Sequence, residues 1–172
     1  MASLLKPGQT LAGYEIIEQV GKGGMGEVYR ARQISMDRIV ALKILSPKLV
    51  AKDPAFTERF VAEARAAGRL NHANIIGVHD VGETTLEVDG KTIGIHYFSM
   101  EFVRGETVKD IIERRGLMPL DDVARIMIAM AEALVYAEAQ KVVHRDIKPE
   151  NIMVSETGDV KLADLGLAEQ VS

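Results

Sequence analysis

The sequence contains no cysteine among its 172 residues. Without thiols the chain can form no disulfide, no thiolate metal site and no thiol nucleophile, so these chemistries are excluded. A cysteine-free chain suits a reducing compartment, and we therefore expect a cytoplasmic protein.

Long apolar runs and blocks of like charge are missing as well. Residues 1–11 carry no apolar run of signal-peptide length. The most apolar stretch, residues 123–139, is shorter than the roughly 20 residues that span a bilayer, and we interpret it as a buried core helix. The 21 basic and 25 acidic residues are mixed along the chain and give a net charge of −4, which disfavours polyanionic partners. We expect no nucleic-acid partner and no membrane segment.

An apolar content of 47% is enough to bury a core in one domain or in two small lobes. The first half is rich in strand patterns, which predict a small antiparallel sheet from residues 14–20, 27–31, 39–45, 75–81 and 93–101. Between the third and fourth runs, residues 56–70 repeat apolar side chains at helical spacing. The acidic insert at residues 83–91 predicts a hairpin turn.

The second half is predominantly helical. Residues 107–115 and 120–140 show helical patterns and are separated by Gly116 and Pro119. Arg104-Gly105 marks the expected boundary between the halves. Short apolar runs predict small strands after the long helix, at residues 142–143, 152–154 and 160–162.

Residues 21–26, Gly-Lys-Gly-Gly-Met-Gly, form a glycine-rich run between two predicted strands. This placement predicts a hairpin tip whose backbone N–H groups can approach a phosphate, because glycine has no Cβ and tolerates positive φ. An ordinary glycine-rich hairpin is the alternative. A dinucleotide-binding fold is a poorer interpretation, because it requires a helix directly after the glycines and residues 27–29 are strand-like.

Two charged residues interrupt apolar patterns. Lys43 lies in a strand that is apolar on both faces, and Glu63 lies within the apolar face of the predicted helix 56–70. Each supplies the partner that the other needs when buried, so a Lys43–Glu63 ion pair is a natural inference. Either side chain alone could instead extend to solvent.

The densest polar segment follows the long helix. Residues 142–154 place Asp146, Lys148 and Asn151 between two short apolar runs, which indicates a rigid loop. A carboxylate there can orient or deprotonate a hydroxyl, the ammonium can offset charge on a phosphoryl group, and the amide oxygen suits magnesium. Asp164 follows the next predicted strand and adds a second oxygen ligand. A solvated surface turn is the alternative for each piece.

In this order and spacing, the glycine run, Lys43, Glu63, the 142–154 loop and the Asp-Leu-Gly of residues 164–166 resemble the protein kinase family. The amino-acid sequence of the glycine run is most similar to that of bacterial eukaryotic-like serine/threonine kinases. The resemblance implies an α+β fold, with an antiparallel five-stranded N-lobe carrying one main helix and the first, mostly helical part of a C-lobe. The implied division is an N-terminal extension, an N-lobe with the hinge, and a partial C-lobe, at residues 1–13, 14–103 and 104–172.

The same resemblance implies that the chain binds ATP with Mg²⁺ and transfers the γ-phosphoryl group to serine or threonine hydroxyls of a protein substrate. Asp146 would be the catalytic base. Lys148, two residues further on, would identify the chain as a serine/threonine kinase and not a tyrosine kinase. Lys43, held by Glu63, would contact the α and β phosphates, and magnesium would be held by Asn151 and Asp164. The residues implied around ATP belong to the glycine loop, the adenine pocket and the hinge: Val20, Gly21, Lys22, Gly23, Gly24, Met25, Gly26, Val28, Ala41, Lys43, Met100, Glu101, Phe102, Val103 and Met153.

The sequence departs from the family pattern in small ways and in one large way. Leu165 replaces the usual phenylalanine, and Ala73 stands where proline is common. The chain ends at Ser172, before the family's activation segment and peptide-binding region, so Arg145 would lack its regulatory partner. The loss of later helices would leave an apolar patch liable to self-association, around Ile126, Met127, Met130 and Leu134. Of the four histidines, we expect His144 in the core and the others on the surface or in strands.

Three functions are compatible with these features. The first is a protein serine/threonine kinase, and the alternative is a truncated ATP-binding fragment or pseudokinase-like module without efficient phosphotransfer. A small-molecule kinase is a weaker interpretation, because Lys148 and Pro149-Glu150 fit the protein-kinase catalytic loop.

Overall fold

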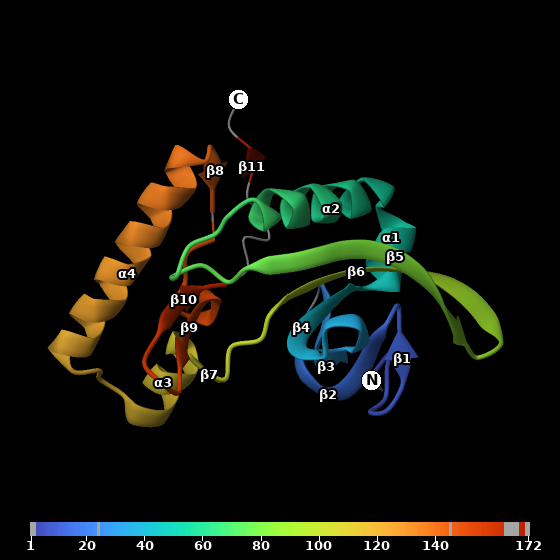
Figure 1. The fold of residues 1–172 in the computed structure, drawn as a ribbon, viewed down its shortest axis with the longest axis horizontal. Helices are drawn as coiled ribbons and strands as arrows, with labels where there is room; N and C mark the ends of the chain where they lie inside the picture. Colours follow the sequence, from blue (N-terminus) through green and yellow to red (C-terminus); the bar gives the residue numbers. More distant parts are fainter. Residues whose placement is uncertain (1–2, 24, 145, 164–168, 171–172) are drawn as a thin grey trace. The chain divides into compact units, whose positions relative to one another are not determined.

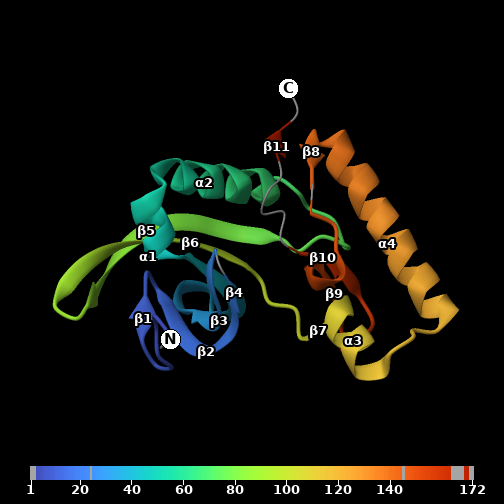
Figure 2. The same cartoon turned by 180° about the vertical axis from the view of Figure 1, so that it is seen from behind.

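The computed structural model describes residues 3–23, 25–144, 146–163 and 169–170, with residues 54, 169 and 170 described by their backbone alone (Figure 1; seen from behind in Figure 2). The chain divides into two compact units. Unit 1 comprises Met1–Ala62 and Val78–Phe102, and unit 2 comprises Glu63–Gly77 and Val103–Ser172. The boundary between Ala62 and Glu63 falls inside a single helix.

A six-stranded antiparallel sheet forms the body of unit 1, in the order β1-β2-β3-β4-β6-β5 (Figure 1). Its strands are β1 (Thr10–Leu11), β2 (Tyr14–Gly23), β3 (Gly26–Gln33), β4 (Arg38–Leu45), β5 (Val78–Val88) and β6 (Lys91–Glu101). The five longer strands confirm the predicted antiparallel sheet. Strand β1 is an addition, because two residues are too short to show an alternating pattern. A 3₁₀ turn, Ile34–Met36, joins β3 to β4.

The hairpin between β5 and β6 is longer than expected. The sequence predicts residues 83–91 as a turn, but the two strands pair as far as Val88 and Lys91. Only Asp89 and Gly90 form the turn, with φ values of 50° and 74°. Positive φ at both central residues is what a two-residue type I′ hairpin requires.

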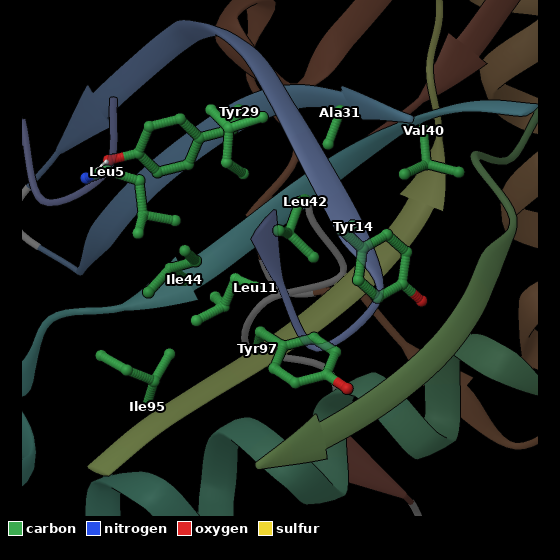
Figure 3. Close-up of a cluster of buried hydrophobic side chains, with 11 residues drawn as sticks. Leu5, Leu11, Tyr14, Tyr29, Ala31, Val40, Leu42, Ile44, Ile95 and Tyr97 are labelled. Atoms are coloured by element: carbon green, nitrogen blue, oxygen red, sulfur yellow. Dashed lines mark hydrogen bonds between the residues drawn. The ribbon is translucent and has the colours of Figure 1, made fainter. Parts of the chain in front are cut away.

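One face of the sheet carries the hydrophobic core of unit 1 (Figure 3). Alternate side chains of β4, Val40, Leu42 and Ile44, are at most 1% exposed and belong to this core. Leu5, which precedes the sheet, is equally buried, so the N-terminal segment covers the same face. The other members are Leu11, Tyr14, Ile16, Tyr29, Ala31, Ile95 and Tyr97. Full burial of a large apolar side chain is worth about 1.5–3 kcal/mol, so these residues fix which face of the sheet is covered.

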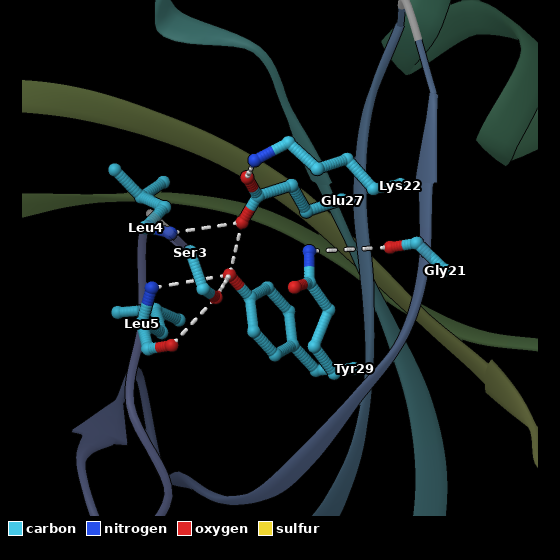
Figure 4. A network of polar contacts seen from close by, with 8 residues as sticks. Ser3, Leu4, Leu5, Gly21, Lys22, Glu27 and Tyr29 are labelled. Carbon is cyan, nitrogen blue, oxygen red and sulfur yellow. Dashed lines mark hydrogen bonds and ion pairs between the residues drawn. The ribbon is translucent and has the colours of Figure 1, made fainter. Parts of the chain in front are cut away.

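A polar network ties the N-terminal segment to β3 (Figure 4). The buried hydroxyl of Tyr29 accepts a hydrogen bond from the Leu5 amide at 3.0 Å, lies 2.8 Å from the Ser3 hydroxyl and donates to the Glu27 carboxylate. The same carboxylate accepts a hydrogen bond from the Leu4 amide at 2.9 Å. The segment is therefore held by polar contacts as well as by the core.

We expect Tyr29→Phe to lower the free energy of unfolding by about 1–3 kcal/mol, because the buried Leu5 amide and the Glu27 carboxylate would lose their partner. Urea denaturation followed by circular dichroism measures the change. Tyr97→Phe is the matched control: Tyr97 lies in the same core, and its hydroxyl has no hydrogen bond to the described part of the chain. The control should change the free energy by less than about 0.5 kcal/mol. Equal losses in both variants would contradict a specific role for the Tyr29 hydroxyl.

Two helices follow β4 in the chain, α1 (Pro47–Lys52) and α2 (Pro54–Gly68). Helix α2 matches the predicted helix, shifted by two residues toward the N-terminus. Phe60 on α2 is buried and packs against Phe98 of β6, with ring centroids 5.1 Å apart. This contact joins the first part of α2 to the sheet of unit 1.

Unit 2 contains two further helices and short strands, as the sequence predicts. The elements are β7 (Gly105–Thr107), α3 (Val108–Arg115), α4 (Leu120–Ala139), β8 (Val142–Val143), the 3₁₀ helix η2 (Pro149–Asn151), β9 (Ile152–Ser155), β10 (Val160–Leu162) and β11 (Glu169–Gln170). The strands form two antiparallel sheets, β10-β9-β7 and β11-β8. Ile75, expected at the start of a strand, instead forms an isolated bridge with Leu162.

Helix α3 has clear start and stop signals. Thr107 and Asp110 form a capping box, in which each side chain accepts a hydrogen bond from the other residue's backbone N–H. Gly116 ends the helix with a φ of 77°, and its N–H donates to the Ile112 carbonyl at 2.7 Å. The glycine stop expected from the sequence is therefore confirmed.

Helix α4 is buried on one face only. Ile126 and Met130 are buried, so their expected place in an exposed patch is wrong, and Leu134 is half-buried. Met127 is 61% exposed, and the further exposed apolar side chains on α4 are Leu120, Val123, Ile128 and Val135. The interpretation as a buried core helix therefore holds for one face of α4. None of the helices in the described residues is long and apolar enough to span a membrane.

Candidate active site

The glycine-rich run is a hairpin tip, as predicted. Strands β2 and β3 pair as far as Lys22 with Glu27 and Gly23 with Gly26. Because the chain continues directly into a strand, the dinucleotide-binding alternative does not fit. Gly24 lies outside the described residues.

Gly26 is the one position in the described part of this hairpin that tolerates no side chain. A Cβ built on it would lie 1.9 Å from the Ile44 carbonyl oxygen of β4, and its φ is 157°. Beside it, the Met25 carbonyl accepts a hydrogen bond from the Ser46 amide at 3.0 Å. The tip is therefore held against the end of β4, with backbone contacts rather than side chains setting its position.

We expect Gly26→Ala to lower the free energy of unfolding by about 1–3 kcal/mol, because the backbone of β4 must move to admit the methyl group. Gly23→Ala is the matched control, since a Cβ at Gly23 would have no neighbour within 4 Å. Thermal unfolding of the two variants measures the difference. Comparable stability of Gly26→Ala and Gly23→Ala would contradict the close packing of the tip.

The face of the sheet opposite the core carries four of the expected nucleotide residues of unit 1, Val28, Ala41, Lys43 and Met100. Val28 of β3 pairs with Lys43 of β4, and Ala41 of β4 pairs with Met100 of β6. Lys43 is 8% exposed, and its Nζ lies 5.7 Å from the centroid of the Phe98 ring. The structure thus places a buried lysine on this face, as the sequence predicts, opposite Val28 of the strand that follows the glycine run.

The remaining expected residues of unit 1 lie at the sheet's end or on its core face. Glu101 ends β6 and Phe102 follows it, with the Arg30 guanidinium 5.4 Å from the centroid of the Phe102 ring. Lys22 lies on the core side of the sheet instead, because its Nζ is 2.8 Å from the carboxylate of Glu27, which bonds Tyr29 of the core. Val20 is 48% exposed.

The catalytic loop expected in unit 2 brings three side chains together. The Lys148 Nζ lies 2.9 Å from the Asp146 carboxylate. The Asn151 side-chain amide donates to the Asp146 carboxylate at 3.1 Å and to the Asp146 carbonyl at 2.8 Å. Because both partners of the Asn151 amide are acceptors, its nitrogen must face Asp146, and its oxygen is left as a metal-ligating atom.

The hydrogen bond from Lys148 is the main reason that the pKa of Asp146 is lowered, with partial burial opposing it and Asn151 assisting. The carboxylate is therefore charged throughout the neutral range. An ionised Asp146 can take up a proton from a hydroxyl group, whereas a protonated carboxyl group already carries one and cannot act as the base.

The buried side chain of His144 is hydrogen-bonded to the backbone of this loop. Its ring is 2% exposed; Nδ1 accepts a hydrogen bond from the Asp146 amide at 3.1 Å, and Nε2 lies 3.0 Å from the Ala163 carbonyl. Since a carbonyl only accepts, Nε2 carries the proton. The sequence correctly predicts a core histidine but gives no sign of these bonds, although a buried imidazole always needs partners.

A second bond links the same loop to the residue before Asp164. The Ala163 amide donates to the Asn151 carbonyl at 2.7 Å. Asp164 itself lies outside the described residues, as does Arg145. Val103 and Met153 belong to unit 2, where Met153 pairs with Thr107 and Lys161 in the small sheet.

No group of three or more histidine, aspartate and glutamate side chains stands ready for a metal ion in the part of the chain that the structure covers. Of the two expected magnesium ligands, Asn151 lies within the described residues and Asp164 does not.

We expect Lys148→Met to raise the pKa of Asp146 toward the ordinary aspartate value of about 3.9, because the main hydrogen bond that lowers it is removed. In the wild-type protein, the stabilising effect of the charged carboxylate is present above the unfolded-state pKa and is lost as pH falls through the lower folded-state value. Carbon-13 NMR titration of the side-chain carboxyl measures both proteins. An unchanged pKa in Lys148→Met would contradict the assigned cause.

Comparisons with known proteins agree with this geometry. The family model of the protein kinase domain, which describes the family's sequence pattern, matches residues 14–172. Serine/threonine-protein kinase PknA of Mycobacterium tuberculosis is 40% identical over 165 residues, which cover 95% of this chain and 37% of that protein. The probable serine/threonine-protein kinase PknB of Corynebacterium glutamicum is 40% identical over 159 residues, covering 92% of this chain and 24% of that one.

A solved structure shows the same fold. The PknI kinase domain of M. tuberculosis superposes with a TM-score of 0.77 at 36% identity, covering 98% of this chain and 64% of that domain. The chain spans well under half the length of the PknA and PknB proteins. The protein-kinase-like α+β fold expected from the sequence is confirmed, and the chain belongs to the protein kinase family.

Proposed function

We propose that this chain is the catalytic region of a bacterial serine/threonine protein kinase, which binds Mg·ATP and transfers the γ-phosphoryl group to a protein hydroxyl. ATP-dependent phosphoryl transfer with a divalent metal is the function of the family. The observation that carries the proposal is the position of Asp146, whose carboxylate is held by Lys148 and Asn151 and whose backbone amide is held by His144.

In this proposal the nucleotide is bound mainly by residues 14–103. Backbone N–H groups of the glycine hairpin cover the phosphates, which is why the fixed position of Gly26 matters. Lys43 contacts the α and β phosphates. Within unit 1, the adenine contacts apolar side chains and the backbone at the end of β6, at Val28, Ala41, Met100, Glu101 and Phe102.

Residues 104–172 supply the chemistry. The depressed pKa of Asp146 keeps it ionised, so it accepts the proton of the attacking serine or threonine hydroxyl. The hydroxyl oxygen forms the new bond to the γ phosphorus, and the electron pair of the broken bond leaves with ADP. Lys148, beside Asp146, offsets the negative charge on the transferred group.

The donor set fits a magnesium ion. Asn151 turns its amide oxygen away from Asp146, and Asp164 would provide the second ligand. When bound, magnesium neutralises charge on the phosphate oxygens.

The partners follow from this chemistry and from the surface. The substrate is a protein with an accessible serine or threonine. The exposed apolar side chains of α4, including Met127, Ile128 and Val135, support self-association as a further contact. The cysteine-free composition supports a cytoplasmic location.

We expect Asp146→Asn to lower kcat for phosphoryl transfer by about 10²-fold or more, with little change in the KM for ATP, because the base acts on the hydroxyl and not on nucleotide binding. Transfer of ³²P from Mg·ATP to a generic basic protein substrate measures this. Asp121→Asn, an exposed carboxylate on α4, is the matched control and should keep wild-type activity.

Two results would contradict the proposal. One is an Asp146→Asn variant as active as the wild type. The other is a chain that binds Mg·ATP but shows no transfer above the Asp146→Asn background, which would favour the nucleotide-binding module without phosphotransfer.

A further inference from the structure

A pocket lies behind the glycine hairpin, on the core side of the sheet. It is open to solvent on one side and has a volume of about 480 Å³, which suits a small molecule. Apolar side chains from three separated segments line it: Leu4 before the sheet, Ile44, Leu45 and Pro47 around the end of β4, and Ile93 on β6. Ile44 belongs to the core of unit 1, with Leu4 and Ile93 packed against it, so this pocket is not on the Lys43 face.

The charged groups that line the pocket include one, Lys48, that no ion pair within the described residues balances. Lys22 and Glu27 both line it and form an ion pair at 2.8 Å, so together they are neutral. Lys48 also lines it, is exposed and has no ion pair within the described residues. Ser46 beside it makes no capping hydrogen bond with its side chain, so its hydroxyl is available to a ligand. The pocket thus offers apolar walls, one cation and one hydroxyl.

The walls on the hairpin side are fixed. Burial tends to raise the pKa of Glu27, but hydrogen bonds from Lys22, Tyr29 and the Leu4 amide outweigh it, so the carboxylate is ionised and locked (Figure 4). The same carboxylate therefore holds the backbone of Leu4 and the side chain of Lys22 in place. A preformed wall lowers the ordering cost of binding.

Occupancy of the pocket bears on the glycine hairpin itself. Lys22, Gly23, Gly26 and Glu27 all line the pocket, and all belong to the hairpin tip or its base. The proposed nucleotide contacts use the backbone N–H groups of the same residues. A ligand that packs against the rear of the hairpin therefore restricts its movement over the phosphates.

We propose that this pocket is a regulatory site for a small, mainly apolar molecule with one carboxylate, which lies on Leu4, Ile44 and Ile93 and pairs with Lys48. The claim that a ligand binds depends only on the pocket. The claim that the ligand changes the affinity for nucleotide depends on the proposed kinase function.

The test uses 4-phenylbutyrate and its neutral amide, 4-phenylbutyramide, as probes of equal shape. Nitrogen-15 NMR titration of the chain should show shifts centred on the amides of Lys22, Glu27, Ser46 and Lys48. The carboxylate should bind about fivefold more tightly than the amide, the effect of one charge-assisted contact near solvent. Lys48→Met should remove this preference. Lys52→Met, one turn further along α1 and outside the pocket, should keep it.

Three results would overturn the proposal: no shifts at millimolar probe, shifts centred on Met100 to Phe102 instead, or equal affinity for the acid and the amide. A parallel titration with Mg·ADP separates the two claims. Probe binding with a changed ADP affinity supports the regulatory role, and probe binding with an unchanged ADP affinity overturns it. Probe binding in a chain that binds no ADP would leave the ligand pocket standing and refute the proposed function.

Discussion

The register of β4 is the constraint on which the rest of the structure depends. Side chains alternate along a strand, so burying Leu42 and Ile44 in the core forces Lys43 to the opposite face. A slip of one residue would place the lysine ammonium in the apolar core and remove Leu42 and Ile44 from it, and burying an unpaired charge is costly in free energy. Strand β3 follows the same rule, with Tyr29 on the core face and Val28 opposite Lys43. One face thus carries the core, and the other carries Lys43, which we propose contacts the nucleotide.

Unit 2 reaches a defined chemical arrangement by a different route, through hydrogen bonds within a short loop. Asp146 is fixed at its amide by His144 and at its carboxylate by Lys148 and Asn151. His144 and Asn151 also bond the backbone of Ala163, so the loop and the chain before Asp164 are positioned together. These bonds lie within one unit, so the orientation of the proposed base does not depend on the sheet.

Much of the fold was predictable because its periodic patterns are local. The long strands, both helices of unit 2 and the burial of Lys43 and His144 follow from alternation, helical spacing and glycine stops. The sequence could not indicate what depends on distant contacts: the partners of Tyr29, or which face of α4 is covered. Strand pairing beyond residue 83 was missed because an acidic, glycine-containing segment looks like a turn whether the turn has two residues or nine.

Lys43, on the face of β4 opposite the core, is proposed to bind a phosphate of the nucleotide, and calorimetric titration with Mg·ADP measures this contact. The account predicts that the wild type and Lys91→Met, an exposed lysine at the start of β6, bind alike, whereas Lys43→Met binds about tenfold or more weakly because a charge-assisted phosphate contact is lost. Circular dichroism should show that Lys43→Met is folded. Equal affinity of the three proteins, or no binding by a cooperatively folded wild type, would contradict the account.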